Sequence, residues 1–406
     1  MPIFNNLPAI VYQLMVGFIF LNPIPHTTSL KELLFYLSVI LLGWAVATRK
    51  TALVYRSPLT VPLLLFGAWS LFDLAFALNK VGSLHDFYDH YLKNILLFFI
   101  LLNVVDDQQR FQRLLRLIII SAVGFSAWAL VQNYVVLGNP LASRMGSASG
   151  LPEFVTNVSE LISILALLFT LHQLSTEKPG PGKIFLLLGL IPLLAAAILP
   201  QSRSSLIALA VGLLIMLARK PKLLAALIVT LLIALPTIPR PERLSSEFGE
   251  SRERLFLALL AIEVIKDHPL TGTGFDITSI AYIKDALPEQ YQGYRNTVVK
   301  EYQIPPTVIF QPWPHNMFLS LMMRTGAIGL LLFLNLIRAN LQMSWQLIRH
   351  GSEPFIRGWA LTLAAAFLTF IAKGMFEPVF TQFCDTIFYS LLALNTLLWR
   401  FNREKA

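Results

Sequence analysis

A histidine at the junction between a polar segment and an apolar run is the first residue here that suggests chemistry. His315 follows Pro312 and Pro314 and precedes a long apolar stretch. Proline is tolerated at or just before a helix start, so we expect His315 at or near a helix N-terminus. An imidazole titrates near neutral pH and can take a proton from a substrate hydroxyl as a general base. The alternative is a structural histidine that hydrogen-bonds locally.

An arginine in a very short turn is the second such residue. Arg203 lies in the turn Pro200-Gln-Ser-Arg-Ser204, between two apolar stretches. A guanidinium beside the free N–H groups of a new helix start suits phosphate, which it can grip with two parallel hydrogen bonds. The alternative is that Arg203 extends to lipid head groups. Both interpretations stay open from this residue alone.

The composition predicts that these residues belong to an integral membrane protein. The 406-residue chain is 55% apolar and 14% charged, whereas soluble domains are about 45–50% apolar and about 25% charged. The single cysteine, Cys384, excludes an intramolecular disulfide and a cysteine metal cage. In a membrane protein the location of a net charge of +9 matters more than its size. We therefore expect membrane lipid, and no nucleic acid, as a partner.

Apolar runs predict an all-α polytopic fold with about twelve transmembrane helices. Basic residues gather in the connectors after the even-numbered runs and in the C-terminal tail, which places both termini in the cytoplasm by the positive-inside rule. We expect helices 1–9 in residues 1–238, a long external loop in 239–314, and helices 10–12 with the cytoplasmic tail in 315–406. The runs lie near 8–23, 30–47, 59–78, 91–105, 113–136, 154–174, 184–200, 204–219, 222–238, 316–338, 356–374 and 380–399.

The long external loop should contain amphipathic helices. Residues 254–267 are interpreted as one amphipathic helix that lies on the membrane or the helical bundle, and the sequence His268-Pro-Leu-Thr-Gly-Thr-Gly-Phe275 should end that helix. A second helix is expected over 278–287. Arginine is uncommon in external loops, yet Arg144, Arg203 and Arg254 all fall on this face with Lys300 and His315. For Arg144, in a Gly- and Ser-rich loop, an ordinary connector is the simpler interpretation.

The sequence gives little support to metal or nucleotide chemistry. It has no H-E-x-x-H or C-x-x-C motif, no closely spaced Asp pair on the external face that would hold Mg²⁺ or Mn²⁺, and no Walker loop. We expect no cofactor and no metal site. Without a metal, arginines would have to stabilise any anionic leaving group.

Taken together, the motifs resemble the O-antigen ligase/polymerase superfamily of bacterial polysaccharide enzymes over roughly residues 130–335. Arg254, an apolar helix and the 268–275 segment look like the family's arginine followed by an hPL-GxG pattern. His315 and Gly326 match its His-x10-Gly pattern. Arg203 and Arg144 lie where the family has arginines. The aromatic residue often found shortly after the loop arginine is replaced by Leu257 and Ala258, so Arg252 rivals Arg254 for that position.

This resemblance implies a fold similar to the membrane-embedded GT-C glycosyltransferases. It implies an O-antigen ligase in the bacterial inner membrane that moves a glycan from undecaprenyl diphosphate to the terminal sugar of lipid A–core, as part of lipopolysaccharide biosynthesis. Transfer would invert the anomeric centre on the periplasmic face without a metal. The implied catalytic residues are His315, Arg203 and Arg254, and the implied substrate-binding residues are Arg144, Arg252, Asn316, Trp313, Lys300 and Tyr302, with the two aromatic rings placed to stack on sugars.

Two other functions stay open. A polymerase of the same superfamily would join two lipid-linked repeat units instead of using lipid A–core. A transporter of a lipid-linked precursor should bury ionisable residues at the membrane midplane and contain inverted repeats. Only Asp73, Lys373 and Asp385 are clear intramembrane candidates, and no repeat is visible. The sequence therefore favours the glycosyltransferase.

Overall fold

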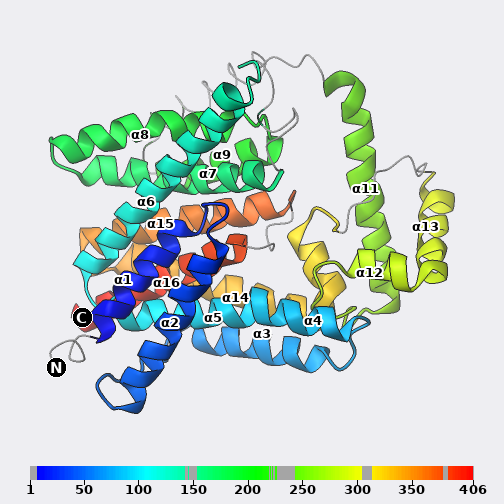
Figure 1. Cartoon of the computed structure of the whole chain (residues 1–406), viewed down its shortest axis with the longest axis horizontal. Helices are drawn as coiled ribbons and strands as arrows, with labels where there is room; N and C mark the ends of the chain where they lie inside the picture. Colours follow the sequence, from blue (N-terminus) through cyan, green and yellow to red (C-terminus); the bar gives the residue numbers. More distant parts are fainter. Residues whose placement is uncertain are drawn as a thin grey trace.

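The structure is a computed structural model that describes residues 7–141, 145, 153–218, 220, 222, 225, 243–303, 313–377 and 383–405. Within these ranges the regular elements are all helical (Figure 1), which confirms the predicted all-α class. Arg144 and most of the run predicted over 222–238 lie outside the described residues.

The helices follow the predicted apolar runs closely. Because each run is a continuous stretch of apolar side chains, its helix begins and ends within a few residues of the composition change, apart from the longer α14. The elements up to the second π-helical segment are α1 (Leu7–Leu21), α2 (Thr28–Ala47), α3 (Thr60–Asp73), α4 (Lys80–Asp86), η2 (Phe87–Leu92), α5 (Lys93–Val104), α6 (Gln108–Val131) and η3 (Gln132–Val136). The others are α7 (Glu153–Thr176), α8 (Pro181–Ile198), α9 (Arg203–Leu217), α11 (Arg243–Asp267), α12 (Ser279–Ala286), α13 (Pro288–Tyr302), α14 (Met317–His350), α15 (Pro354–Gly374) and α16 (Phe383–Lys405).

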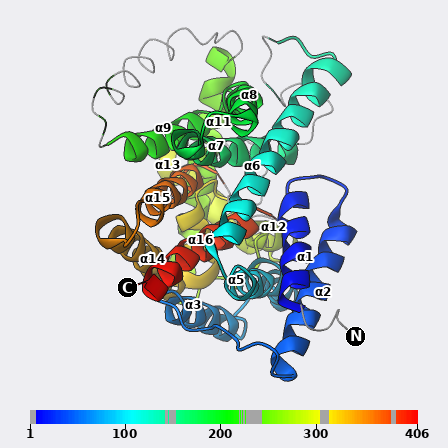
Figure 2. The ribbon, with the colours of Figure 1, turned by 90° about the vertical axis from the view of Figure 1, so that its left-hand side faces the viewer.

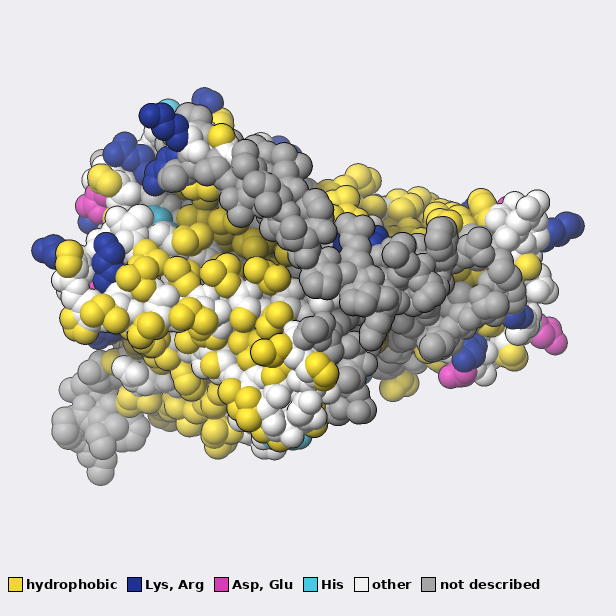
Figure 3. All heavy atoms as spheres, turned by 90° about the horizontal axis from the view of Figure 1, so that it is seen from above, with side chains coloured by type: hydrophobic (Ala, Val, Ile, Leu, Met, Phe, Trp, Pro, Cys, Tyr) yellow, Lys and Arg dark blue, Asp and Glu magenta, His cyan; other side chains and the backbone are white. Residues whose placement is uncertain are grey.

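The chain is a multi-pass membrane protein. Among the described residues six helices are long and apolar enough to cross a membrane, and three more apolar helices are shorter. The predicted number of twelve spans stays a prediction. Large apolar side chains on these helices face outward, as Ile40 and Ile191 do with 65% and 67% of their surface exposed. Figure 3 shows apolar atoms over much of the helical body and charged side chains gathered toward the two ends of the molecule, as expected for a protein surrounded by lipid.

The helical body has α14, α15 and α16 near its centre, with α7, α8 and α9 on one side and α3 and α5 on the other (Figures 1 and 2). Contacts between α15 and α9, and between α14 and α3, join these layers. Helices α11, α12 and α13 project from the end opposite the two termini.

The projecting helices form a lobe with its own apolar core. Phe256 and Leu260 of α11 pack with Ile283 of α12 and Val298 of α13. Helix α11 begins at Arg243, eleven residues before the amphipathic segment predicted over 254–267, and α13 was not predicted as a separate helix. The predicted helix over 278–287 is confirmed as α12.

The glycines of the two family-like patterns meet in one joint. Helix α14 breaks at Gly326, which has φ +65, and a Cβ there would lie 2.0 Å from the carbonyl oxygen of Leu270. The 268–275 segment fills the break: Thr273 N–H donates to the Met323 carbonyl at 2.8 Å and Ala327 N–H donates to the Pro269 carbonyl at 2.9 Å. Irregular backbone is tolerated in a membrane protein where such contacts satisfy it. These glycines therefore serve close packing of two backbones.

Candidate functional site

His315 lies at a helix start, as predicted from the prolines before it. Asn316 is the N-cap of α14, and its side-chain oxygen accepts from the N–H groups of Phe318 at 3.0 Å and Leu319 at 2.9 Å. The Asn316 amide nitrogen donates to the Met375 carbonyl at 3.0 Å. Asn316 therefore ties the start of α14 to the segment that follows α15, which brings His315 beside that segment.

A glutamate that was not predicted from the sequence joins the candidate residues. One carboxylate oxygen of Glu377, Oε2, lies 3.5 Å from Nδ1 of His315. The other, Oε1, lies 3.2 Å from the Arg254 guanidinium and accepts from the Ser204 hydroxyl at 3.3 Å. The start of α14, the helix α11 and the start of α9 thus converge on one carboxylate.

The surroundings of Glu377 keep it negatively charged. Its side chain is only 15% exposed, and burial by itself would raise the pKa of its carboxyl. The contact with His315 and the positive charges of Lys373 and Arg254 outweigh burial and lower the pKa of Glu377 to about 2. At neutral pH the carboxylate is therefore ionised and faces the Nδ1 side of the His315 ring.

Of the two predicted catalytic arginines, Arg254 of α11 contacts this carboxylate, and Arg203 begins α9, the helix whose Ser204 contacts it. The Arg254 side chain is 46% exposed, so its ion pair contributes only about 0–1 kcal/mol to stability. Arg203 is the exposed first residue of α9. It lies between Ser202, which caps the helix, and Ser204, which contacts Glu377. The arrangement combines a histidine, a carboxylate and arginine side chains near the end of the body that carries the lobe.

The other predicted site residues have less defined positions. Lys300 and Tyr302 are exposed at the end of α13, and Trp313 is half-buried two residues before His315. Arg252 belongs to α11, but its side chain, like the whole of Arg144, lies outside the described residues. The only signal for Glu377 in the sequence was an acidic residue in the short connector between the last two apolar runs.

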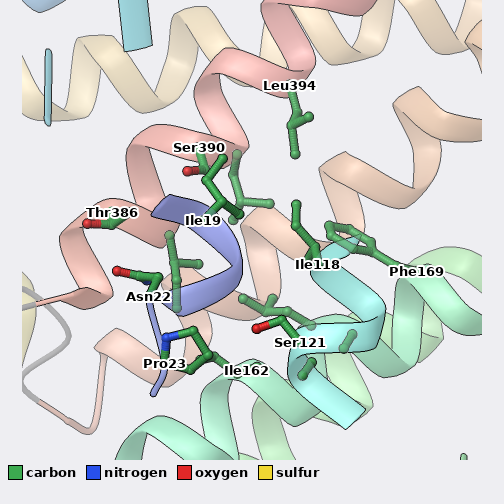
Figure 4. Close-up of a pocket in the computed structure, with 15 residues that line it drawn as sticks. Ile19, Asn22, Pro23, Ile118, Ser121, Ile162, Phe169, Thr386, Ser390 and Leu394 are labelled. Atoms are coloured by element: carbon green, nitrogen blue, oxygen red, sulfur yellow. The ribbon is translucent and has the colours of Figure 1, made fainter. Parts of the chain in front are cut away.

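Pockets and metal-binding groups do not point to another centre within the described part of the chain. No group of three or more His, Cys, Asp or Glu residues is placed to hold a metal ion there. A pocket of about 600 Å³, partly open, lies between α1, α6, α7 and α16 (Figure 4). Its lining is mostly apolar and includes none of the residues around Glu377.

Comparison with known families points in the same direction as the geometry. Residues 188–334 match the model of a family described as O-Antigen ligase. This range contains Arg203, Arg254 and His315 but not Glu377, which lies beyond its end. No curated protein matches the chain. The segment 188–334 is therefore similar to the O-antigen ligase domain, which supports a place for the protein in the O-antigen ligase/polymerase (Wzy-like) superfamily.

Proposed function

We propose that this protein is an O-antigen ligase, which transfers a glycan from undecaprenyl diphosphate to the terminal sugar of lipid A–core. The observation that carries the proposal is the position of Glu377 between His315 and Arg254. A base and a cation held by one carboxylate suit a reaction in which a proton leaves one substrate while negative charge develops on the other.

His315 acts as the general base in this proposal. Nδ1 lies 3.5 Å from Glu377 Oε2. In the proposal Nδ1 carries the ring proton on this side, which leaves Nε2 to accept the proton of the acceptor hydroxyl. Glu377 then stabilises the imidazolium that forms. The same division of labour between a histidine and a carboxylate operates in hydrolytic triads.

The arginines serve the leaving group. As the acceptor oxygen forms its bond to the anomeric carbon, the bond from that carbon to the diphosphate oxygen breaks, and the electron pair stays on the diphosphate. Arg203 and Arg254 neutralise this charge, for which a guanidinium has the right geometry. Attack opposite the diphosphate inverts the anomeric centre. Lys300, Trp313 and Tyr302 are the proposed contacts for the glycans on the periplasmic side.

Transfer by purified protein tests the proposal. Wild-type protein in detergent, with EDTA present, should move glycan from undecaprenyl diphosphate to lipid A–core, and His315→Ala should lower kcat by about 10²–10⁴-fold. The matched control is His350→Ala, which removes an exposed histidine at the far end of α14. Unchanged kcat in His315→Ala would remove the base from the mechanism.

The same assay separates the other functions. Lengthening of the lipid-linked glycan without transfer to lipid A–core would identify a polymerase. Movement of the donor across vesicles, with no new glycosidic bond, would identify a transporter. Loss of transfer in EDTA that is restored by a divalent cation would contradict the metal-free mechanism.

A further inference from the structure

Lys373 and Glu160 form an ion pair inside the helical body, next to the proposed site. Lys373 Nζ lies 2.8 Å from Glu160 Oε2, and only 2% and 1% of the two residues are exposed. Ser205 completes the group: its hydroxyl donates to the same glutamate oxygen at 2.5 Å and accepts from Lys373 Nζ at 2.8 Å. The group thus joins α15, α7 and α9 at one point.

Stability alone is a poor explanation for these charges. Moving an ion pair out of water costs as much as the pair returns, and apolar residues of similar size often give an equally stable protein. Ionisable residues within membrane helices commonly have a functional role. The neighbours of this pair suggest what that role is.

Two chains of contacts connect Lys373 with the proposed site. One route is Ser205, which follows Arg203 and Ser204 in the first turn of α9, where Ser204 contacts Glu377. The other route is the backbone after α15, where the Lys373 carbonyl accepts from the Phe376 N–H at 3.0 Å, one residue before Glu377. Both the segment that carries Arg203 and the segment that carries Glu377 therefore depend on the position of Lys373.

Lys373 itself is too enclosed to meet a substrate. Its ammonium group is held by Glu160 and Ser205 beneath the surface. Its charge is still felt at Glu377, since it is one of the cations that lower the pKa of that carboxyl. It therefore acts on the site through other residues.

We propose that Lys373, with Glu160 as its counter-ion, is a positioning residue that holds the start of α9 and the Glu377 turn in register for glycosyl transfer. The proposal rests on the function proposed above. It predicts that removing the pair lowers kcat more than it lowers donor affinity, because Arg254 contacts Phe376 and Glu377 and not the pair itself.

The test uses a variant that removes both charges together. Lys373→Met alone leaves Glu160 buried without its cation, so the double variant Lys373→Met/Glu160→Gln is the cleaner choice. Its kcat should fall by about 10²-fold, the scale for a small misplacement of catalytic groups. Its KM for the donor and its affinity for farnesyl diphosphate, used as a probe, should change by no more than about twofold. Lys373→Arg keeps the cation and should retain more activity than the double variant.

A second readout does not depend on catalysis. Amide hydrogen exchange should become faster in the double variant at the first turn of α9 and around Phe376, and stay unchanged at the far end of α9. The control is Lys405→Met, which breaks a Lys–Glu pair of 2.6 Å with Glu353 at the exposed end of the chain. That variant should alter neither kcat nor exchange at α9.

The outcomes distinguish this proposal from the proposed function. A folded double variant with wild-type kcat and wild-type exchange would overturn the positioning role and leave the ligase proposal standing. Faster exchange over the whole body would make the pair a general structural element and also overturn it. If the wild type transfers no glycan, the ligase proposal falls, and local exchange at α9 still decides whether Lys373 positions that segment.

Discussion

Two histidine–carboxylate pairs lie at opposite ends of the connection between α15 and α16. His315 meets Glu377 just after α15, and His90 of η2 meets Asp385 in the first turn of α16. An arginine accompanies each pair: Arg254 at the first, and Arg324 among the charged neighbours of the second. The pairs share a chemistry but differ in access, because Arg254 is 46% exposed and Arg324 is 2% exposed.

The buried pair has the features of a structural joint. Both Nε and one terminal nitrogen of the Arg324 guanidinium donate to the Phe275 carbonyl, and the guanidinium lies over the Phe275 ring. The Arg324 guanidinium is thereby bonded to the 268–275 segment, which fills the break in α14. In the other pair the Arg254 side chain is nearly half exposed. The comparison suggests that a histidine, a carboxylate and an arginine form a structural joint where the arginine is buried against backbone, and can serve the proposed chemistry where it is exposed.

Removing each of the two arginines should have the largest effects, and the two effects should differ in kind. Arg324→Met leaves Asp385 and its acidic neighbours without their buried cation and should lower the free energy of unfolding by about 3–5 kcal/mol. Arg254→Met should lower it by less than about 1 kcal/mol while raising KM for the donor. Thermal and denaturant unfolding in detergent, with transfer kinetics on the folded fraction, measure both. Equal loss of stability in the two variants would contradict the distinction.

Acid titration should show how strongly the neighbours of Glu377 hold its carboxylate ionised. The pKa of Glu377 is about 2 in the folded protein, against about 4.3 for an exposed glutamate. The carboxylate therefore contributes about 3 kcal/mol of stability above pH 4.3 that is lost as the pH falls toward 2. Unfolding measured between pH 6 and pH 3 should show this decline in the wild type, with a smaller slope in Glu377→Gln. An identical slope in both proteins would show that Glu377 is not held ionised by its neighbours.

The smallest expected effect belongs to Ser204. Its hydroxyl donates to Glu377 at 3.3 Å, a long contact, so Ser204→Ala should cost about 0.5–1.5 kcal/mol in kcat/KM. Ser175→Ala is the control, because that exposed hydroxyl bonds only within α7. Steady-state transfer kinetics measure the difference. A loss as large as that of His315→Ala would mean that Ser204 itself touches a substrate.

The positions of the helices were predicted from the sequence better than the side-chain pairs that join them. Continuous apolar runs define where a helix begins and ends, which is why α7, α8 and α15 match their predicted runs within a few residues. Pairings such as Lys373 with Glu160 join residues 213 positions apart, and no local pattern encodes them. Lys373 and Asp385 were therefore considered as signs of transport, whereas the structure gives each a charged partner. Asp73 is buried, and neither carboxylate oxygen has a hydrogen-bond partner in the described residues.

The candidate site was predictable only where a residue carries its own local signal. His315 and Arg203 lie beside prolines or hydroxyl residues that mark helix starts, and their positions at the starts of α14 and α9 follow from that. Glu377 has no such signal, because its role depends on three segments that meet only in the folded protein. Its roles and those of the arginines remain proposals.

The interlocked break in α14 also limits how the molecule can be divided. The 268–275 segment belongs in sequence to the projecting lobe, but its backbone completes the hydrogen bonding of a helix in the body. The ten residues between His315 and Gly326 are therefore part of both the lobe and the body. An attempt to graft the lobe from another chain would have to carry the first turns of α14 with it, so the lobe and the proposed base, His315, would be exchanged as one piece.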